Sequence, residues 1–156
     1  DKIRLGASGK ITSAFDMARV MALGADWCNA ARGFMFAVGC IQAQACHTGM
    51  CPTGVTSQDP LRQRAVVVPD KAERVVNFHR NTLHALGELV AAAGLSHPSE
   101  LRPHHFNRRG NSDSVISFAD QYEQLQPGQL LVDPASSPRF SGPWKQSSAA
   151  SFDRVS

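Results

Sequence analysis

The chain has 156 residues, 42% of them hydrophobic and 19% charged, a balance that predicts a globular core rather than a disordered chain. The formal net charge is only +3, and the one basic cluster, at 102–109, fits a solvent-facing or anion-facing loop, so we expect no nucleic-acid partner. No apolar run approaches the roughly eighteen residues of a membrane span, and no basic-then-apolar leader opens the sequence. Three of the four cysteines are bunched, unlike the spread pairs of secreted domains, which predicts a cytoplasmic protein without a membrane partner.

Two strand–loop–helix units are predicted at the start of the chain. Residues 2–8 and 25–31 have the short apolar character of buried strands. The first helix follows Thr12 as N-cap and stops at Gly24, and the second covers 33–44. This alternation predicts parallel strands with helical crossovers, hence an α/β protein. Because two strands leave open edges and an uncovered face, we expect further strands from the same gene or from another chain.

A turn-rich loop and one long helix come next. Asp70 and Glu73 have the spacing of a capping box, and apolar residues then recur on one helical face over about 71–93. The sequence after this region is rich in Ser, Pro and Gln, a composition typical of an extended or partly disordered tail. We therefore predict a folded part over residues 1–109 and a tail over 110–156.

Both predicted strands end in small-residue loops that lead into helices, at 7–12 and 29–34. Parallel neighbours place such loops side by side, and each helix N-terminus points free N–H groups toward the gap, which suits a phosphate group. Gly9 allows close approach of the backbone, and Lys10 or Arg32 adds positive charge. Loops of this kind bind phosphate in eight-stranded α/β barrels. The residues alone leave open the simpler interpretation that Gly9 and Gly33 only form tight turns.

Three cysteines, Cys40, Cys46 and Cys51, follow with the spacing C-x5-C-x4-C. They converge only if the chain leaves the helix and wraps a compact object. Thiolates are soft ligands, and three of them suit an iron–sulfur cluster with three irons or with one open corner. The spacing lacks the C-x2-C pairs of a zinc ribbon. It leaves open structural thiols, a redox switch, or a zinc site completed by His47.

Three stretches between about Ile3 and Arg109 stand out: "ASGKI", "ALGADWCNAARGFMFAVGCIQAQACHTGMCPTGVTSQDP" and "DKAERVVNFHRNTLHALGELVAAAGLSHPSEL". Together they resemble the end of the FMN-binding barrel of the glutamate synthase family, and most closely its short members that lack an amidotransferase domain. The resemblance implies the last two strand–helix units of a TIM (β/α)8 barrel, followed by an iron–sulfur loop at 40–51, the long helix and the tail.

The resemblance also implies two cofactors, FMN and a [3Fe-4S] cluster. In the family, three cysteines bind the cluster, which implies this role for Cys40, Cys46 and Cys51. The loops after strands seven and eight hold the FMN phosphate, although the large glutamate synthases have Asp-Gly-Gly in the first of them. The implied phosphate contacts in this chain are Ser8, Gly9, Lys10, Ala31 and Arg32.

The chemistry implied by the resemblance is reductive. Electrons enter through the cluster and reduce FMN, and the flavin delivers hydride to a 2-imino acid formed from 2-oxoglutarate and ammonia or glutamine nitrogen, giving L-glutamate. The electron donor is expected to be a ferredoxin or an NAD(P)H-linked flavoprotein subunit. No catalytic acid or base can be named, and the chain without the remaining barrel strands is expected to be inactive. A non-catalytic electron-transfer or assembly subunit and an N-methylglutamate synthase-like enzyme are the alternatives.

Overall fold

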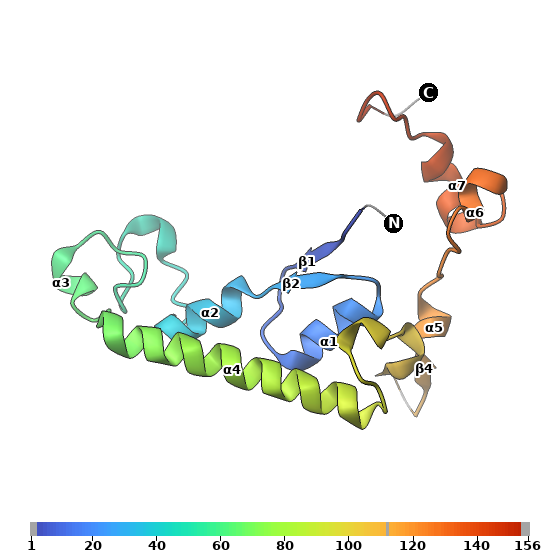
Figure 1. Cartoon of the computed structure of the whole chain (residues 1–156). Helices are drawn as coiled ribbons and strands as arrows, with labels where there is room; N and C mark the ends of the chain where they lie inside the picture. Colours follow the sequence, from blue (N-terminus) through green and yellow to red (C-terminus); the bar gives the residue numbers. More distant parts are fainter. Residues whose placement is uncertain (1–2, 112, 154–156) are drawn as a thin grey trace. The chain divides into compact units, whose positions relative to one another are not determined.

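The computed structural model describes residues 3–111 and 113–153 (Figure 1). The chain divides into two compact units, Asp1–Phe118 and Ala119–Ser156. The first unit contains the cysteines and the predicted phosphate loops. In the described part of the chain, no helix is long and apolar enough to cross a membrane.

The two predicted parallel strands are present but are shorter than expected. β1 (Gly6–Ser8) and β2 (Trp27–Asn29) pair in parallel, with Ser8 opposite Asn29. The crossover between them is α1 (Ala14–Ala22), as a parallel pair requires. A Cβ at Gly6 would lie 2.5 Å from the Trp27 ring nitrogen, so only glycine permits this cross-strand approach. The mixed α/β organisation is therefore confirmed for this unit.

α1 begins one residue later than predicted. Its N-cap is Ser13 and not Thr12: the Ser13 hydroxyl accepts from the backbone N–H of Asp16, and the Asp16 carboxylate accepts from the backbone N–H of Ser13. Gly24 follows the helix with φ +114°, as the predicted stop requires. The buried side chains of α1 lie on one face, which packs on α4, and they are Ala14, Ala18 and Ala22.

α2 (Ala31–Val38) is much shorter than the predicted helix over 33–44. Gly39 takes φ +119° at its end, and Gln42 and Gln44 also have positive φ, so the chain leaves the helix before Cys40. Within α2, Gly33 is buried against α4, where a Cβ would lie 2.6 Å from the Phe78 ring. Its role is therefore close helix packing.

The long helix is α4 (Val68–Ala92), which runs alongside both α1 and α2 (Figure 1). The predicted Asp70–Glu73 capping box is wrong, because the helix begins after Val67 with Pro69 in its first turn and has no side-chain cap among the described residues. Leu86 and Val90 are buried. The preceding short elements are η1 (Cys46–Thr48) and α3 (Pro60–Gln63).

The rest of the first unit surrounds a small cluster of aromatic rings. η2 (Pro98–Glu100) and η3 (Pro103–His105) lead into an antiparallel hairpin of β3 (Asn107–Arg109) and β4 (Val115–Ser117). Phe106 packs edge-on against Phe15 of α1, with ring centroids 5.5 Å apart, and stacks with Phe118 at 5.9 Å. These contacts give residues after 106 a place in the core that their composition did not indicate.

Short helices occur in the segment that the sequence predicts to be an extended or partly disordered tail. After the hairpin come α5 (Phe118–Gln121), α6 (Gln129–Val132) and α7 (Pro138–Lys145). Gly128, with φ +78°, leads into α6, and the fully buried Ser137 caps α7 by accepting from the backbone N–H of Phe140. Local capping therefore gives this Ser- and Pro-rich segment short helices.

Candidate functional site

The predicted phosphate residues lie at one edge of the parallel strand pair. Ser8 ends β1, and Gly9 and Lys10 follow it with φ +96° and +54°. Because Ser8 lies opposite Asn29, the residues that follow β2, Ala31 and Arg32, leave the sheet at the same edge. All of these residues except Ala31 carry side-chain or backbone features that suit an anion: a hydroxyl, a glycine turn and two cations.

The two helix N-termini at this edge differ in charge. At α1, Asp16 Oδ2 accepts from the backbone N–H groups of Thr12 and Ser13 at 3.1 Å each. Burial raises the pKa of Asp16, but the hydrogen bonds from Thr12 and Ser13 outweigh it and the pKa is lowered. The Asp16 carboxylate thus already accepts hydrogen bonds from the backbone N–H groups at the start of α1 and offsets the partial positive charge there.

The N-terminus of α2 lacks such an internal anion. Its N-cap, Ala30, makes no side-chain cap, and its first turn has no acidic residue but contains the exposed Arg32. The first N–H groups of a helix have no intrahelical partner and carry partial positive charge. The α2 N-terminus is therefore the better of the two for a phosphate group, a distinction that the Ser13-x-x-Asp16 pattern carries in the sequence but that our prediction overlooked.

The cysteine loop starts where α2 ends and is folded back on itself. Gly49 and Gly54 have φ +73° and +75°. The buried Ser57 fixes the fold of the loop: its hydroxyl donates to the carbonyl of Gly49 at 2.6 Å, and its own carbonyl accepts from Gln63 Nε2 at 2.9 Å. A Cβ at Gly54 would overlap the carbonyl oxygen of Arg62, so the loop packs directly on the α3 backbone.

This fold places all three predicted cluster ligands around one cavity. Cys40, Cys46 and Cys51 line it together with Met35, Val55 and two threonines. All three are free thiols; Cys51 is buried, Cys46 is exposed, and Cys40 is intermediate. The backbone N–H of Gln42 donates to Cys40 Sγ at 3.5 Å. The cavity is small, with a volume of about 10 Å³.

The hydrogen bonds around Cys51 favour the thiolate form of its side chain. Hydrogen bonds from the Thr53 hydroxyl and from the backbone N–H groups of Thr56 and Thr53 lower its pKa from 9.0 to about 6. The thiolate is the form that binds metal, and such hydrogen bonds favour it at neutral pH. Burial instead raises the pKa of Cys28, in β2, as expected of a core thiol. These threonines were missed because the sequence does not reveal which hydroxyl lies near which sulfur.

Within residues 3–111 and 113–153, no group of three or more His, Cys, Asp or Glu side chains is gathered tightly enough to hold a single metal ion. A three-iron cluster differs from a single ion because each cysteine binds its own iron, so the thiolates surround a cavity and do not meet at a point. The arrangement of the cysteines and their hydrogen-bond donors is compatible with that requirement.

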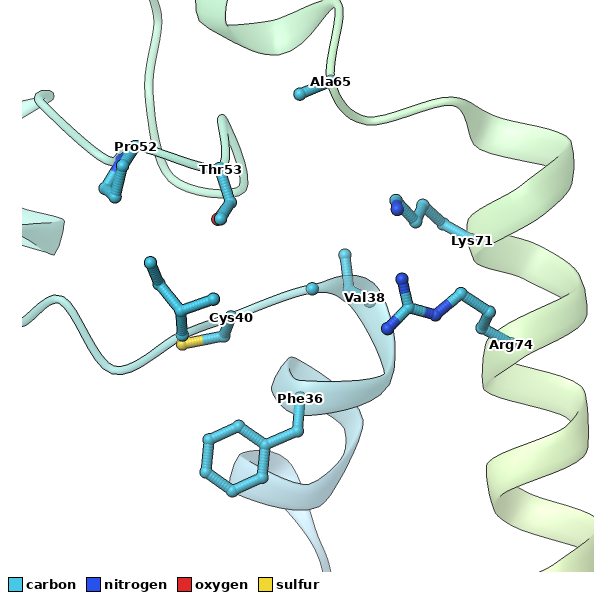
Figure 2. A pocket seen from close by; sticks show the side chains of 10 residues that line it. Phe36, Val38, Cys40, Pro52, Thr53, Ala65, Lys71 and Arg74 are labelled. Carbon is cyan, nitrogen blue, oxygen red and sulfur yellow. The ribbon is translucent and has the colours of Figure 1, made fainter.

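A second, larger cavity of about 450 Å³ lies beside Cys40 (Figure 2). Figure 2 shows Lys71 and Arg74 extending from α4 into it, toward the end of α2. Lys71 is mostly buried, with a side chain 19% exposed, and its ammonium group pairs with Asp70 at 3.0 Å. Two cations thus lie on the α4 side of the first cysteine. The prediction from sequence had missed both.

Residues 1–96 match the family model described as a conserved region in glutamate synthase. The chain belongs to the glutamate synthase family. It is 40% identical over 124 residues to the glutamate synthase large subunit-like protein YerD of Bacillus subtilis. The matched region covers 80% of this chain and 24% of that protein.

Two further family members extend the comparison. An archaeal glutamate synthase [NADPH] of Methanocaldococcus jannaschii is 33% identical over 110 residues, covering 70% of this chain and 22% of that protein. The glutamate synthase [NADPH] large chain of Azospirillum brasilense is 29% identical over 142 residues, covering 89% of this chain and 9% of that protein. The chain therefore spans about a quarter or less of these relatives. No solved structure matches it significantly.

Proposed function

We propose that this chain is the part of a glutamate synthase-type oxidoreductase that holds a [3Fe-4S] cluster and the phosphate of FMN. The complete enzyme would reduce a 2-imino acid, formed from 2-oxoglutarate and ammonia or glutamine nitrogen, to L-glutamate. One observation carries the proposal: three free cysteines line a common cavity directly after α2, whose other end presents an uncapped N-terminus and Arg32.

Cys40, Cys46 and Cys51 would hold the cluster, which supplies one-electron transfer when bound. Their surroundings support this role. Cys51 favours its thiolate form, and Cys40 accepts a backbone N–H bond from Gln42. Such outer hydrogen bonds orient thiolate ligands and stabilise their negative charge.

Ser8, Gly9 and Lys10 from one loop, and Ala31 and Arg32 from the other, would bind the FMN phosphate. The flavin supplies hydride transfer, and the protein contributes its position and its electrostatic surroundings. Since α2 has eight residues, its length is about 12 Å at 1.5 Å per residue. The phosphate loop and the first cluster ligand are therefore close enough for a flavin and a cluster to occupy neighbouring sites.

The remaining barrel strands would complete the fold. Ile3, Leu5 and Trp27 lie on or next to the two strands and are 84%, 58% and 48% exposed. Both faces of a parallel sheet are normally covered by other parts of the protein, so apolar residues on or beside its strands are usually buried. Further strands pairing with β1 and β2 would cover them, as in the proposed TIM barrel. We also propose a cytoplasmic location and a ferredoxin or NAD(P)H-linked flavoprotein subunit as electron donor.

Cofactor analysis of the intact protein, purified and reconstituted without oxygen, tests this proposal. We expect iron and acid-labile sulfide in the proportion of a [3Fe-4S] cluster, together with FMN and glutamate formation from 2-oxoglutarate and a nitrogen donor. Replacing Cys46 by Ser should abolish cluster binding, whereas replacing Cys28 by Ser should leave it intact. Protein that takes up neither iron nor FMN after reconstitution would contradict the proposal, and uptake of both without glutamate formation would indicate an electron-transfer or assembly role.

A further inference from the structure

The hydroxyl of Thr56 is buried in the wall of the cysteine cavity and has no hydrogen-bond partner within the described part of the chain. Buried hydroxyl groups nearly always find a partner in the protein, in water or in a ligand. Thr56 therefore has a donor available at the position where the three cysteines converge.

The neighbouring polar groups of the loop already have defined partners. The Thr53 hydroxyl lies 3.5 Å from Cys51 Sγ, and the Ser57 hydroxyl donates to the carbonyl of Gly49. Thr56 lines the same cavity as Thr53 and Cys51, but its hydroxyl forms no hydrogen bond within the described residues.

Most of the remaining cavity wall is apolar and offers the hydroxyl no acceptor. Its apolar members are Met35, Ile41, Ala43, Ala45 and Val55. A cluster held by the three cysteines that share this wall would bring sulfur acceptors into the cavity that the Thr56 hydroxyl lines. Both the sulfide ions of a cluster and the thiolates that bind it accept hydrogen bonds.

We infer that Thr56 is a positioning residue that donates a hydrogen bond to a sulfur of the bound cluster and thereby raises its reduction potential. This inference rests on the proposed function. A hydrogen bond to sulfur withdraws negative charge from the cluster, and the reduced form, which carries one more electron, gains more from it. Thr56 would thus set how readily the cluster accepts electrons, without touching the substrate.

Two substitutions of the same residue separate the hydroxyl from the shape of the side chain. Thr56→Val keeps the volume and removes the hydroxyl, whereas Thr56→Ser keeps the hydroxyl. Both are made in the intact protein, which is reconstituted without oxygen, and the midpoint potential of the cluster is measured by redox titration followed by electron paramagnetic resonance. Thr82→Val is the matched control, because the Thr82 hydroxyl donates to the carbonyl of Phe78 on α4.

We expect a lower midpoint potential for Thr56→Val and a potential close to the parent for Thr56→Ser and Thr82→Val. If Thr56→Val fails to bind iron and sulfide while Thr56→Ser binds both, the hydroxyl is required and the inference holds. An unchanged potential in Thr56→Val, or an equal loss of the cluster in both Thr56 variants, would overturn it. A parent protein that binds no iron would instead refute the proposed function.

Discussion

Two constraints shape the cysteine loop: positive backbone φ angles and close packing of the backbone. Alanine substitutions at two glycines of the loop, with a third glycine in α4 as control, separate these constraints. Gly54 has φ +75°, and a Cβ there would overlap the backbone of Arg62. Gly49 has nearly the same φ, +73°, but open space around it. Gly87 lies within α4, also in open space and without a positive φ. Alanine at each position therefore introduces both constraints, one, or neither.

The expected changes in the free energy of unfolding differ in sign as well as in size. Gly87→Ala should stabilise the protein by about 0.5–1 kcal/mol, because alanine loses less backbone entropy in a helix. Gly49→Ala should destabilise it by about 1–2 kcal/mol, the cost of a left-handed conformation for an L-residue. Gly54→Ala adds an overlap with backbone atoms that cannot rotate away, which costs about 1–3 kcal/mol more.

Urea unfolding of the intact protein, followed by far-ultraviolet circular dichroism, measures all three changes under the same conditions. Iron uptake after anaerobic reconstitution provides a second measure, and it should fall most in Gly54→Ala. The reasoning is refuted if Gly54→Ala is no more destabilising than Gly49→Ala, because the loop then does not pack on α3. Equal effects at Gly49 and Gly87 would show that positive φ is not the constraint.

Four further substitutions or measurements probe other parts of the molecule. Gly33→Ala should destabilise the protein by about 1–3 kcal/mol through its clash with Phe78, and adding Phe78→Leu should recover part of that loss in urea unfolding. In metal-free protein, iodoacetamide labelling of Cys51 should rise around pH 6, whereas Cys28 should require a pH above 9; similar profiles would contradict the lowered pKa. Because the pKa of Cys51 is lower in the folded protein, its thiolate should stabilise the metal-free fold fully above pH 9, and this stabilisation should be lost as the pH falls to about 6. Urea unfolding at several pH values measures the change. Arg32→Gln should weaken FMN binding about tenfold or more, the effect of losing one charge-assisted hydrogen bond, and unchanged affinity in a fluorescence titration would exclude the contact.

The order of elements was predictable from the sequence because its signals are local. Alternating strand and helix patterns gave the parallel pair with its crossover, and the glycine after α1 marked a helix end. The end of α2 was not predictable in this way. Apolar residues continue after Gly39, at Ile41, Ala43 and Ala45, and a glycine inside such a run is compatible with either a helix or a stop. The stop is visible only in the positive φ of Gly39, Gln42 and Gln44.

The candidate site shows the same division. The bunching of the cysteines singled out three residues that line one cavity, and the family resemblance implied their role as ligands. The sequence could not identify Thr53, Thr56 or Lys71, because their proximity to the sulfurs depends on the path of the loop and on the packing of α4 against α2. Candidate ligand residues can be chosen from chemical type, spacing and resemblance, whereas the groups that surround them depend on tertiary structure.

The charges around α2 explain how one short helix could serve an anion at each end. A helix N-terminus attracts a phosphate, but a helix C-terminus carries partial negative charge and opposes an anion placed there. Two features offset this opposition. The N–H groups of Gly39 and Cys40 donate to the carbonyl of Met35, at 3.2 and 2.9 Å, and so satisfy part of the exposed C-terminal charge. Arg74 and Lys71, the latter paired with Asp70, then place cationic groups in the cavity beside Cys40 (Figure 2), where they would offset the negative charge of a bound cluster.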